Sequence, residues 1–124
     1  MAGPTRLGPE YQISTALNPD LNRYKPAVAY NSKRNEFLVV CHYHDAGHYW
    51  IEGRIVNSSG KPVGVVRKIT QASQVGVYQP AVAYNAMNNK YLVFWMNNTI
   101  GDGKTYEIWG NTFSADLVAH RASL

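Results

Sequence analysis

The residues best suited to chemistry gather between positions 41 and 48. His42, His44, Asp45 and His48 form the pattern H-x-H-D-x-x-H. Alternate residues of a β-strand point to the same face, so His42 and His44 would share a face, and His48 could return across a turn. Imidazole is a common zinc ligand. His42, His44 and His48 are therefore a weak candidate for a metal site; the alternative is a polar hairpin tip, and we expect no cofactor.

Cys41 is the one cysteine, so an internal disulfide is impossible. A nucleophilic thiol needs a nearby base and electropositive surroundings. His42 is adjacent in sequence, but neighbouring residues of a strand face opposite ways. The chain has no nucleophile elbow, paired-carboxylate pattern or phosphate loop. We interpret Cys41 as a packing position and expect no catalytic residue.

Aromatic residues with polar neighbours indicate a different function. The chain has nine Tyr, three Trp and three Phe. The apolar face of a pyranose can stack on an aromatic ring while nearby polar side chains bind its hydroxyls. The alternative is that these rings only fill space between packed sheets. The expected ligand-binding residues are Tyr49, Trp50, Glu52, Arg54, Tyr106, Trp109 and Asn97.

The elements that would position these residues come in two copies. Residues 24–40 read YKPAVAYNSKRNEFLVV and residues 78–94 read YQPAVAYNAMNNKYLVF, which are identical at ten of 17 positions with an offset of 54. The sequence YWIEG at 49–53 matches YEIWG at 106–110, where the offset has grown to 57. A further match, IST at 13–15 and ITQ at 69–71, precedes each copy.

Each copy predicts short strands separated by polar turns, and no segment has a helical period. We expect strands at 11–15, 27–30, 36–43, 49–56 and 63–70, followed by three more between residues 81 and 113. Four short antiparallel strands repeated about every 50 residues are typical of a β-propeller blade.

The pattern PAVAYN…(F/Y)LVV…I-x-G resembles the repeats of bacterial β-propeller proteins over about 100 of the 124 residues. The resemblance implies an all-β fold, a β-propeller built from two four-stranded blades per chain. It carries over no catalytic residue. The alternative fold is a two-sheet β-sandwich.

The strand count predicts how the fold closes. We expect a single domain over 1–124, with residues 11–23 as a strand that completes a blade in a neighbouring chain, a first blade repeat at 24–77 and a second at 78–124. Two blades cannot make a ring, because propellers use about four to eight. We therefore expect a cyclic homo-oligomer with head-to-tail interfaces, three chains being the preferred number.

Composition excludes other classes of partner. The net charge is +4, but basic residues occur singly or in pairs and no nucleic-acid motif is present, so we do not expect nucleic acid as a partner. No apolar run approaches the roughly 20 residues of a membrane helix, so we expect no membrane partner. The first nine residues lack the apolar core of a signal peptide. The compartment stays open.

The expected function is non-enzymatic, lectin-like carbohydrate binding by an oligomeric β-propeller, with glycans and further copies of the chain as partners. The organisation is similar to that of small bacterial and fungal lectins whose two-blade chains assemble as a ring. A scaffold that binds protein partners is the alternative. A metal-dependent hydrolase using His42, His44 and His48 is a third hypothesis.

Overall fold

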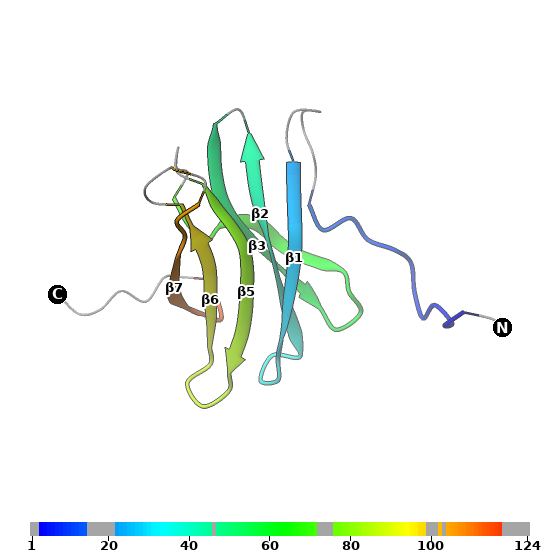
Figure 1. The fold of residues 1–124 in the computed structure, drawn as a ribbon. Coiled ribbons are helices and arrows are strands. Elements are labelled where there is room, and N and C mark those ends of the chain that lie inside the picture. Colours follow the sequence, from blue (N-terminus) through cyan, green and yellow to red (C-terminus); the bar gives the residue numbers. More distant parts are fainter. Residues whose placement is uncertain are drawn as a thin grey trace.

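The fold of this chain was determined as a computed structural model (Figure 1). It describes residues 3–14, 22–45, 47–71, 76–98, 102 and 104–117. Within these ranges the chain forms seven strands and no helix, which confirms the expected all-β class. Accordingly, the described residues contain no helix with the length and hydropathy needed to cross a membrane.

The first sheet contains four antiparallel strands in sequence order: β1 (Asn22–Asn31), β2 (Glu36–Asp45), β3 (His48–Asn57) and β4 (Pro62–Lys68). Consecutive strands pair because short polar turns join them. Asn57 shapes the β3–β4 turn, since its side-chain oxygen accepts hydrogen bonds from the backbone N–H groups of Ser59 and Lys61. Gly60 supplies the positive φ of 85° that this turn requires.

The second sheet contains three antiparallel strands in sequence order: β5 (Val77–Asn85), β6 (Lys90–Asn97) and β7 (Glu107–Ser114). β7 is the repeat equivalent of β3. In the first sheet β4 pairs with β3, but no described strand pairs with the edge of β7 that faces away from β6. Four strands are therefore followed by three, as the repeat predicted.

The backbone repeats as closely as the sequence does. Lys25 and its equivalent Gln79 have φ values of 54° and 52°, and each lies in a register shift where its strand meets the next one. Asn35 and its equivalent Asn89 have φ values of 51° and 55° and lie in the turns that follow β1 and β5. Positive φ is uncommon outside glycine. Its recurrence at the same two repeat positions indicates that both sheets are built on one plan.

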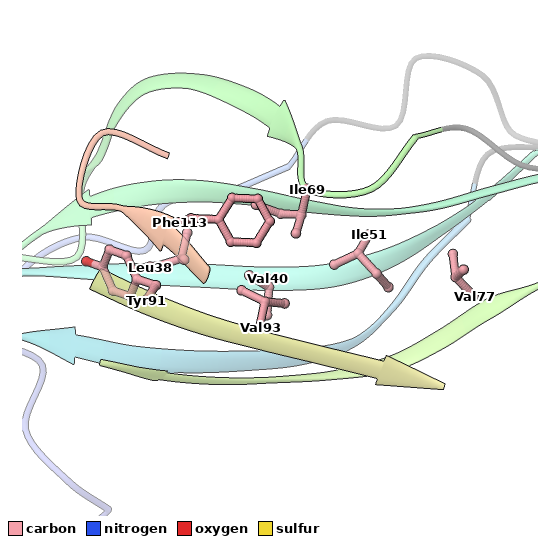
Figure 2. Close-up of a cluster of buried hydrophobic side chains, with 8 residues drawn as sticks. All are labelled: Leu38, Val40, Ile51, Ile69, Val77, Tyr91, Val93 and Phe113. Carbon is pink, nitrogen blue, oxygen red and sulfur yellow. The ribbon is translucent and has the colours of Figure 1, made fainter. Parts of the chain in front are cut away.

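The two sheets pack face to face, and their inner faces form the core. Figure 2 shows this core between the strands. Burying large apolar side chains contributes about 1.5–3 kcal/mol each. The first sheet supplies Leu38, Val40 and Ile51 together with Ile69, which follows β4; the second supplies Val77, Tyr91, Val93 and Phe113.

The outer face of the second sheet carries large apolar side chains that are exposed. Phe94 is 43% exposed and Ile108 is 71% exposed. Their repeat equivalents in the first sheet, Val40 and Ile51, are both 0% exposed because the second sheet covers them. The same sequence position is thus core in one repeat and surface in the other.

The end of the segment before β1 contacts the first sheet. Residues 3–14 contain no strand, residues 3–12 are exposed, and Figure 1 shows this segment extending outward from the side of the first sheet that faces away from the second. The carbonyl oxygen of Ile13 accepts a hydrogen bond from Arg54 Nη1 at 3.0 Å. Thr15, the last residue of the expected leading strand, lies outside the described residues. Pairing of this segment with a neighbouring chain stays a prediction.

Candidate functional site

Aromatic rings from both sheets meet where β2 ends and where β3, β5 and β7 begin. We call His42, His44, Tyr49, Tyr78 and Tyr106 the junction cluster. The His44 and Tyr49 rings stack with centroids 4.4 Å apart and planes 4° apart. Tyr49 in turn contacts Tyr78 edge-on at 5.5 Å. Tyr78 connects the two sheets, because its ring also lies 5.6 Å from His42 and 6.2 Å from Tyr106.

Local backbone features explain why Tyr78 can occupy this place. It immediately precedes the left-handed residue Gln79, where β5 changes register against β6. Its ring also lies directly over Gly76. A Cβ atom at Gly76 would overlap the phenol ring, so any side chain there would displace Tyr78. Gly76 is itself fixed, since its carbonyl oxygen accepts a hydrogen bond from the Asn98 N–H at 2.9 Å.

Beside these rings is a cavity of about 230 Å³. It is lined by His42, Tyr78, Gln79, Met96 and Tyr106, so both sheets contribute and no carboxylate, ammonium or guanidinium group is in the lining. Tyr106 is 41% exposed, which leaves its ring accessible from solvent. The cavity therefore combines apolar ring surface with uncharged polar atoms.

The electrostatics keep this lining neutral. His42 is 7% exposed, and its Nδ1 accepts a hydrogen bond from the Gln79 N–H at 3.2 Å. Burial lowers the pKa of His42, and electrostatic repulsion from His44 and Lys25 lowers it further. Burial also raises the pKa of Tyr78, reinforced by its hydrogen bond with Tyr49. Both groups are uncharged near neutral pH, which suits a neutral ligand.

Trp50, Glu52 and Arg54 lie elsewhere, on the outer face of the first sheet. The Trp50 ring stacks on Tyr43 with centroids 3.6 Å apart, and its Nε1 donates to Glu52 Oε2 at 3.3 Å. Lys68 Nζ lies 4.4 Å from the Trp50 ring centroid. Glu52 is 4% exposed, and Cys41 Sγ lies 3.7 Å from its Oε1. These contacts indicate a packing role for Trp50 and Cys41.

The remaining predicted ligand residues also lie outside the cavity. Trp109 is 49% exposed on β7, opposite Trp95, and its Nε1 donates to Glu107 Oε2 at 2.9 Å. Asn97 ends β6, one residue after Met96, and its side-chain oxygen is buried without a hydrogen-bond partner in the described part of the chain. Of the seven predicted residues, only Tyr49 and Tyr106 join the junction cluster.

The sequence marks Tyr78 as one of the aromatic rings suited to sugar recognition, but the seven expected ligand residues do not include Tyr78, Gln79 or Met96. The sequence feature that could have indicated Tyr78 is the tyrosine that opens each YxPAVAYN motif. In the structure Tyr78 stands immediately before the bulge in β5, and its ring contacts the other sheet. His42 was considered only as a metal ligand.

The histidines do not converge on a metal site. His42 and His44 share a face of β2 as expected, but the ring of His44 stacks on Tyr49. His48 is exposed and lies across the turn, paired with Asp45 in the β2–β3 ladder. Among the described residues, no three His, Cys, Asp or Glu side chains are grouped so that they could hold a metal ion.

The fold and site define a class: an all-β chain of two repeat-related antiparallel sheets with an uncharged aromatic cavity at their junction. Comparisons of this chain with protein families, with curated proteins and with solved structures find no match.

Proposed function

We propose that this chain is a non-enzymatic, lectin-like module that binds a neutral carbohydrate at the junction cluster. The main observation in support is the cavity of about 230 Å³, which Tyr78 and Tyr106 help to line. Its lining contains no carboxylate, and its one basic side chain is neutral His42. A pyranose offers an apolar face and several hydroxyls. Aromatic rings next to amide and imidazole groups bind both parts of such a ligand.

Neutrality favours this ligand class over charged ones. An anionic substrate would call for a cationic side chain in the cavity, and a cationic ligand for a carboxylate. Gln79 brings an amide, which can both donate to and accept from a hydroxyl. Its side chain is exposed, so it can reach a ligand without losing a buried partner.

We further propose that the two sheets are blades of an oligomeric β-propeller. A two-sheet sandwich would bury both inner faces and present polar outer faces to water. The outer face of the second sheet is instead apolar, with Ala81, Ala83, Leu92, Phe94 and Ile108 in register on β5, β6 and β7. Such a face favours a third layer, which repeated blades would supply.

A glycan array followed by titration calorimetry tests the binding proposal. The wild-type chain should bind neutral pyranose-containing glycans. Tyr106→Ala, which removes an exposed ring and leaves the core intact, should weaken binding about tenfold or more, since a lost ring contact of about 1.4 kcal/mol corresponds to that factor. Tyr106→Phe keeps the ring and should retain most of the affinity.

Met87→Ala is the matched control, because Met87 is 95% exposed in the β5–β6 turn, away from the cluster. It should bind as the wild-type chain does. An array without any bound glycan, obtained with the folded chain, would contradict the proposal and favour a protein-binding scaffold.

A further inference from the structure

We propose that a second copy of this chain completes the second sheet: residues 11–14 of that copy add as a fourth strand to the open edge of β7, while the outer face of the second sheet packs on the outer face of that copy's first sheet. This inference rests on the propeller architecture proposed above. It does not depend on the carbohydrate. Three observations lead to it.

The first observation is that the uncovered faces are repeat copies of covered ones. The inner face of the first sheet includes Leu38 and Ile51, both 0% exposed against the second sheet. Their equivalents Leu92 and Ile108 lie on the outer face of the second sheet, where Ile108 is 71% exposed. The outer face of the second sheet therefore carries the positions that the first sheet uses to bind a neighbouring sheet.

The complementary surface is also present, and its side chains on β1 are exposed. The second sheet contacts the core through Val82 and Tyr84 of β5. Their equivalents in β1 are Val28 and Tyr30, which lie on the outer face of the first sheet and are 58% and 46% exposed. One chain thus presents both halves of the contact it makes internally. The two halves can meet only between copies, in a head-to-tail contact of the kind from which rings are built.

The second observation concerns the edge of β7. In the first sheet, Ile69 N–H donates to the Ile51 carbonyl at 2.7 Å, and Thr70 Oγ1 accepts from the Ile51 N–H at 3.0 Å. These bonds continue the sheet beyond β4. The equivalent of Ile51 is Ile108, whose edge of β7 has no described strand beside it.

The leading segment carries the residues needed there. Ile13 and Ser14 match Ile69 and Thr70 in the sequence repeat. Ser14 keeps the hydroxyl with which Thr70 binds the backbone, and Ile13 keeps the apolar side chain that Ile69 inserts into the core. By the same register, Gln12 would lie opposite Trp109, as Lys68 lies opposite Glu52.

The third observation is the place of this segment in its own chain. A cavity of about 450 Å³ between the sheets is lined in part by Ile69, Thr70, Trp95 and Asn111. A cavity of about 240 Å³ on the outer face of the first sheet is lined in part by their four repeat equivalents, Ile13, Ser14, Cys41 and Arg54.

Residues 13–14 therefore already occupy a place on the first sheet that is equivalent to the place of residues 69–70 on the second sheet. When another copy packs the outer face of its second sheet on this first sheet, residues 13–14 lie beside the edge of that copy's β7. Donation of the strand then needs no rearrangement of the segment.

Native mass spectrometry of two variants tests the face contact. Ile108→Glu places a charge on a side chain that is already 71% exposed in the single chain, so it should leave the fold intact and reduce the oligomer to monomer. Met87→Glu, at a position that is 95% exposed and on neither face, should keep the oligomer. An oligomer that survives Ile108→Glu would overturn the face contact.

Cysteine trapping tests the strand. In a Cys41→Ser background, chains with Gln12→Cys alone are mixed with chains with Trp109→Cys alone and oxidised. Paired strands bring such positions within disulfide reach, so we expect a covalent dimer that contains one chain of each kind. Replacing Gln12→Cys with Met87→Cys should abolish that product.

The outcomes separate the proposals. An oligomer that Ile108→Glu disrupts but that gives no mixed disulfide would overturn strand donation and leave the propeller standing. A monomeric wild-type chain would overturn this inference and the propeller together. Binding of glycans by that monomer would still leave the carbohydrate site standing.

Discussion

At the scale of single residues, the core contains a tyrosine whose ionisation should set the alkaline limit of stability. Tyr91 is 0% exposed, and burial raises its pKa from 10.0 to about 12, against smaller lowering by Asn31 and Arg34. Between pH 10 and 12 the unfolded chain loses this proton while the folded chain retains it. The free energy of unfolding should therefore keep its highest value, as far as Tyr91 is concerned, below pH 10 and fall as the pH rises through this range.

Tyr91→Phe, which installs the residue that the first repeat has at Phe37, should remove part of this alkaline loss. Urea denaturation as a function of pH measures it. Tyr106→Phe, at a position that is 41% exposed, is the control and should keep the wild-type dependence. Equal alkaline slopes for Tyr91→Phe and wild type would show that Tyr91 does not carry the effect.

His42 should give the opposite pH dependence. Its pKa is lowered from 6.5 by burial, by His44 and by Lys25, and Tyr78 also packs against it. As the pH falls below 6.5 the unfolded chain binds a proton first, so stability should be full above that pH and decline below it.

His42→Met introduces the side chain that the second repeat has at Met96, and it should flatten this acid decline in denaturation curves between about pH 7 and 5. His48→Gln alters an exposed histidine and should leave the decline as it is. A decline that persists in His42→Met would assign it to other groups.

At the scale of elements, the start of β5 positions the candidate site. Gly76→Ala would place a Cβ where the ring of Tyr78 lies. Tyr78 would have to leave the cavity, so we expect glycan affinity to fall about tenfold while the native mass stays unchanged. Gly8→Ala, which meets nothing within 4 Å, is the matched control. Unchanged affinity in Gly76→Ala would remove Tyr78 from the binding site.

The seven strands β1 to β7 could be predicted from the sequence, because the repeat and its turns mark each one, whereas residues 11–14, expected as part of a further strand, form none within the described chain. The start of β1 could not: the strand was expected from Ala27 but begins at Asn22, since the bulge at Lys25 lets pairing with β2 resume on its far side. The site was harder still. Tyr49 and Tyr106 were named, but Tyr78 meets Tyr49 and His42 only through packing between the sheets, which no spacing along one strand encodes.

Trp50 illustrates the converse problem. Its type and spacing suited a ligand, yet its ring stacks on Tyr43 and lies under Lys68 Nζ, and Glu52 accepts its N–H. Glu52 is two residues along the same strand, but only the β2–β3 and β3–β4 pairings bring Tyr43 and Lys68 to Trp50, and the sequence alone does not reveal those pairings.

At the scale of the whole molecule, the leading segment should determine assembly. A chain that lacks residues 1–14 has no strand to donate, so its oligomers should dissociate at higher concentration than those of the full chain, and the exposed edge of β7 should promote aggregation. A chain that lacks residues 1–9 keeps residues 11–14 and should assemble as the full chain does. Sedimentation velocity over a dilution series compares them. Identical behaviour of both truncations would argue against strand donation.

The most direct test of the proposed assembly is the native mass of the full chain. In the proposed assembly, further copies cover the apolar outer face of the second sheet and pair with the edge of β7. The mass should therefore be a whole multiple, two or more, of the 13.9 kDa chain mass, with no dominant monomer. A folded chain that stays monomeric at 13.9 kDa across the concentration range would contradict the claim that these sheets are blades of a ring.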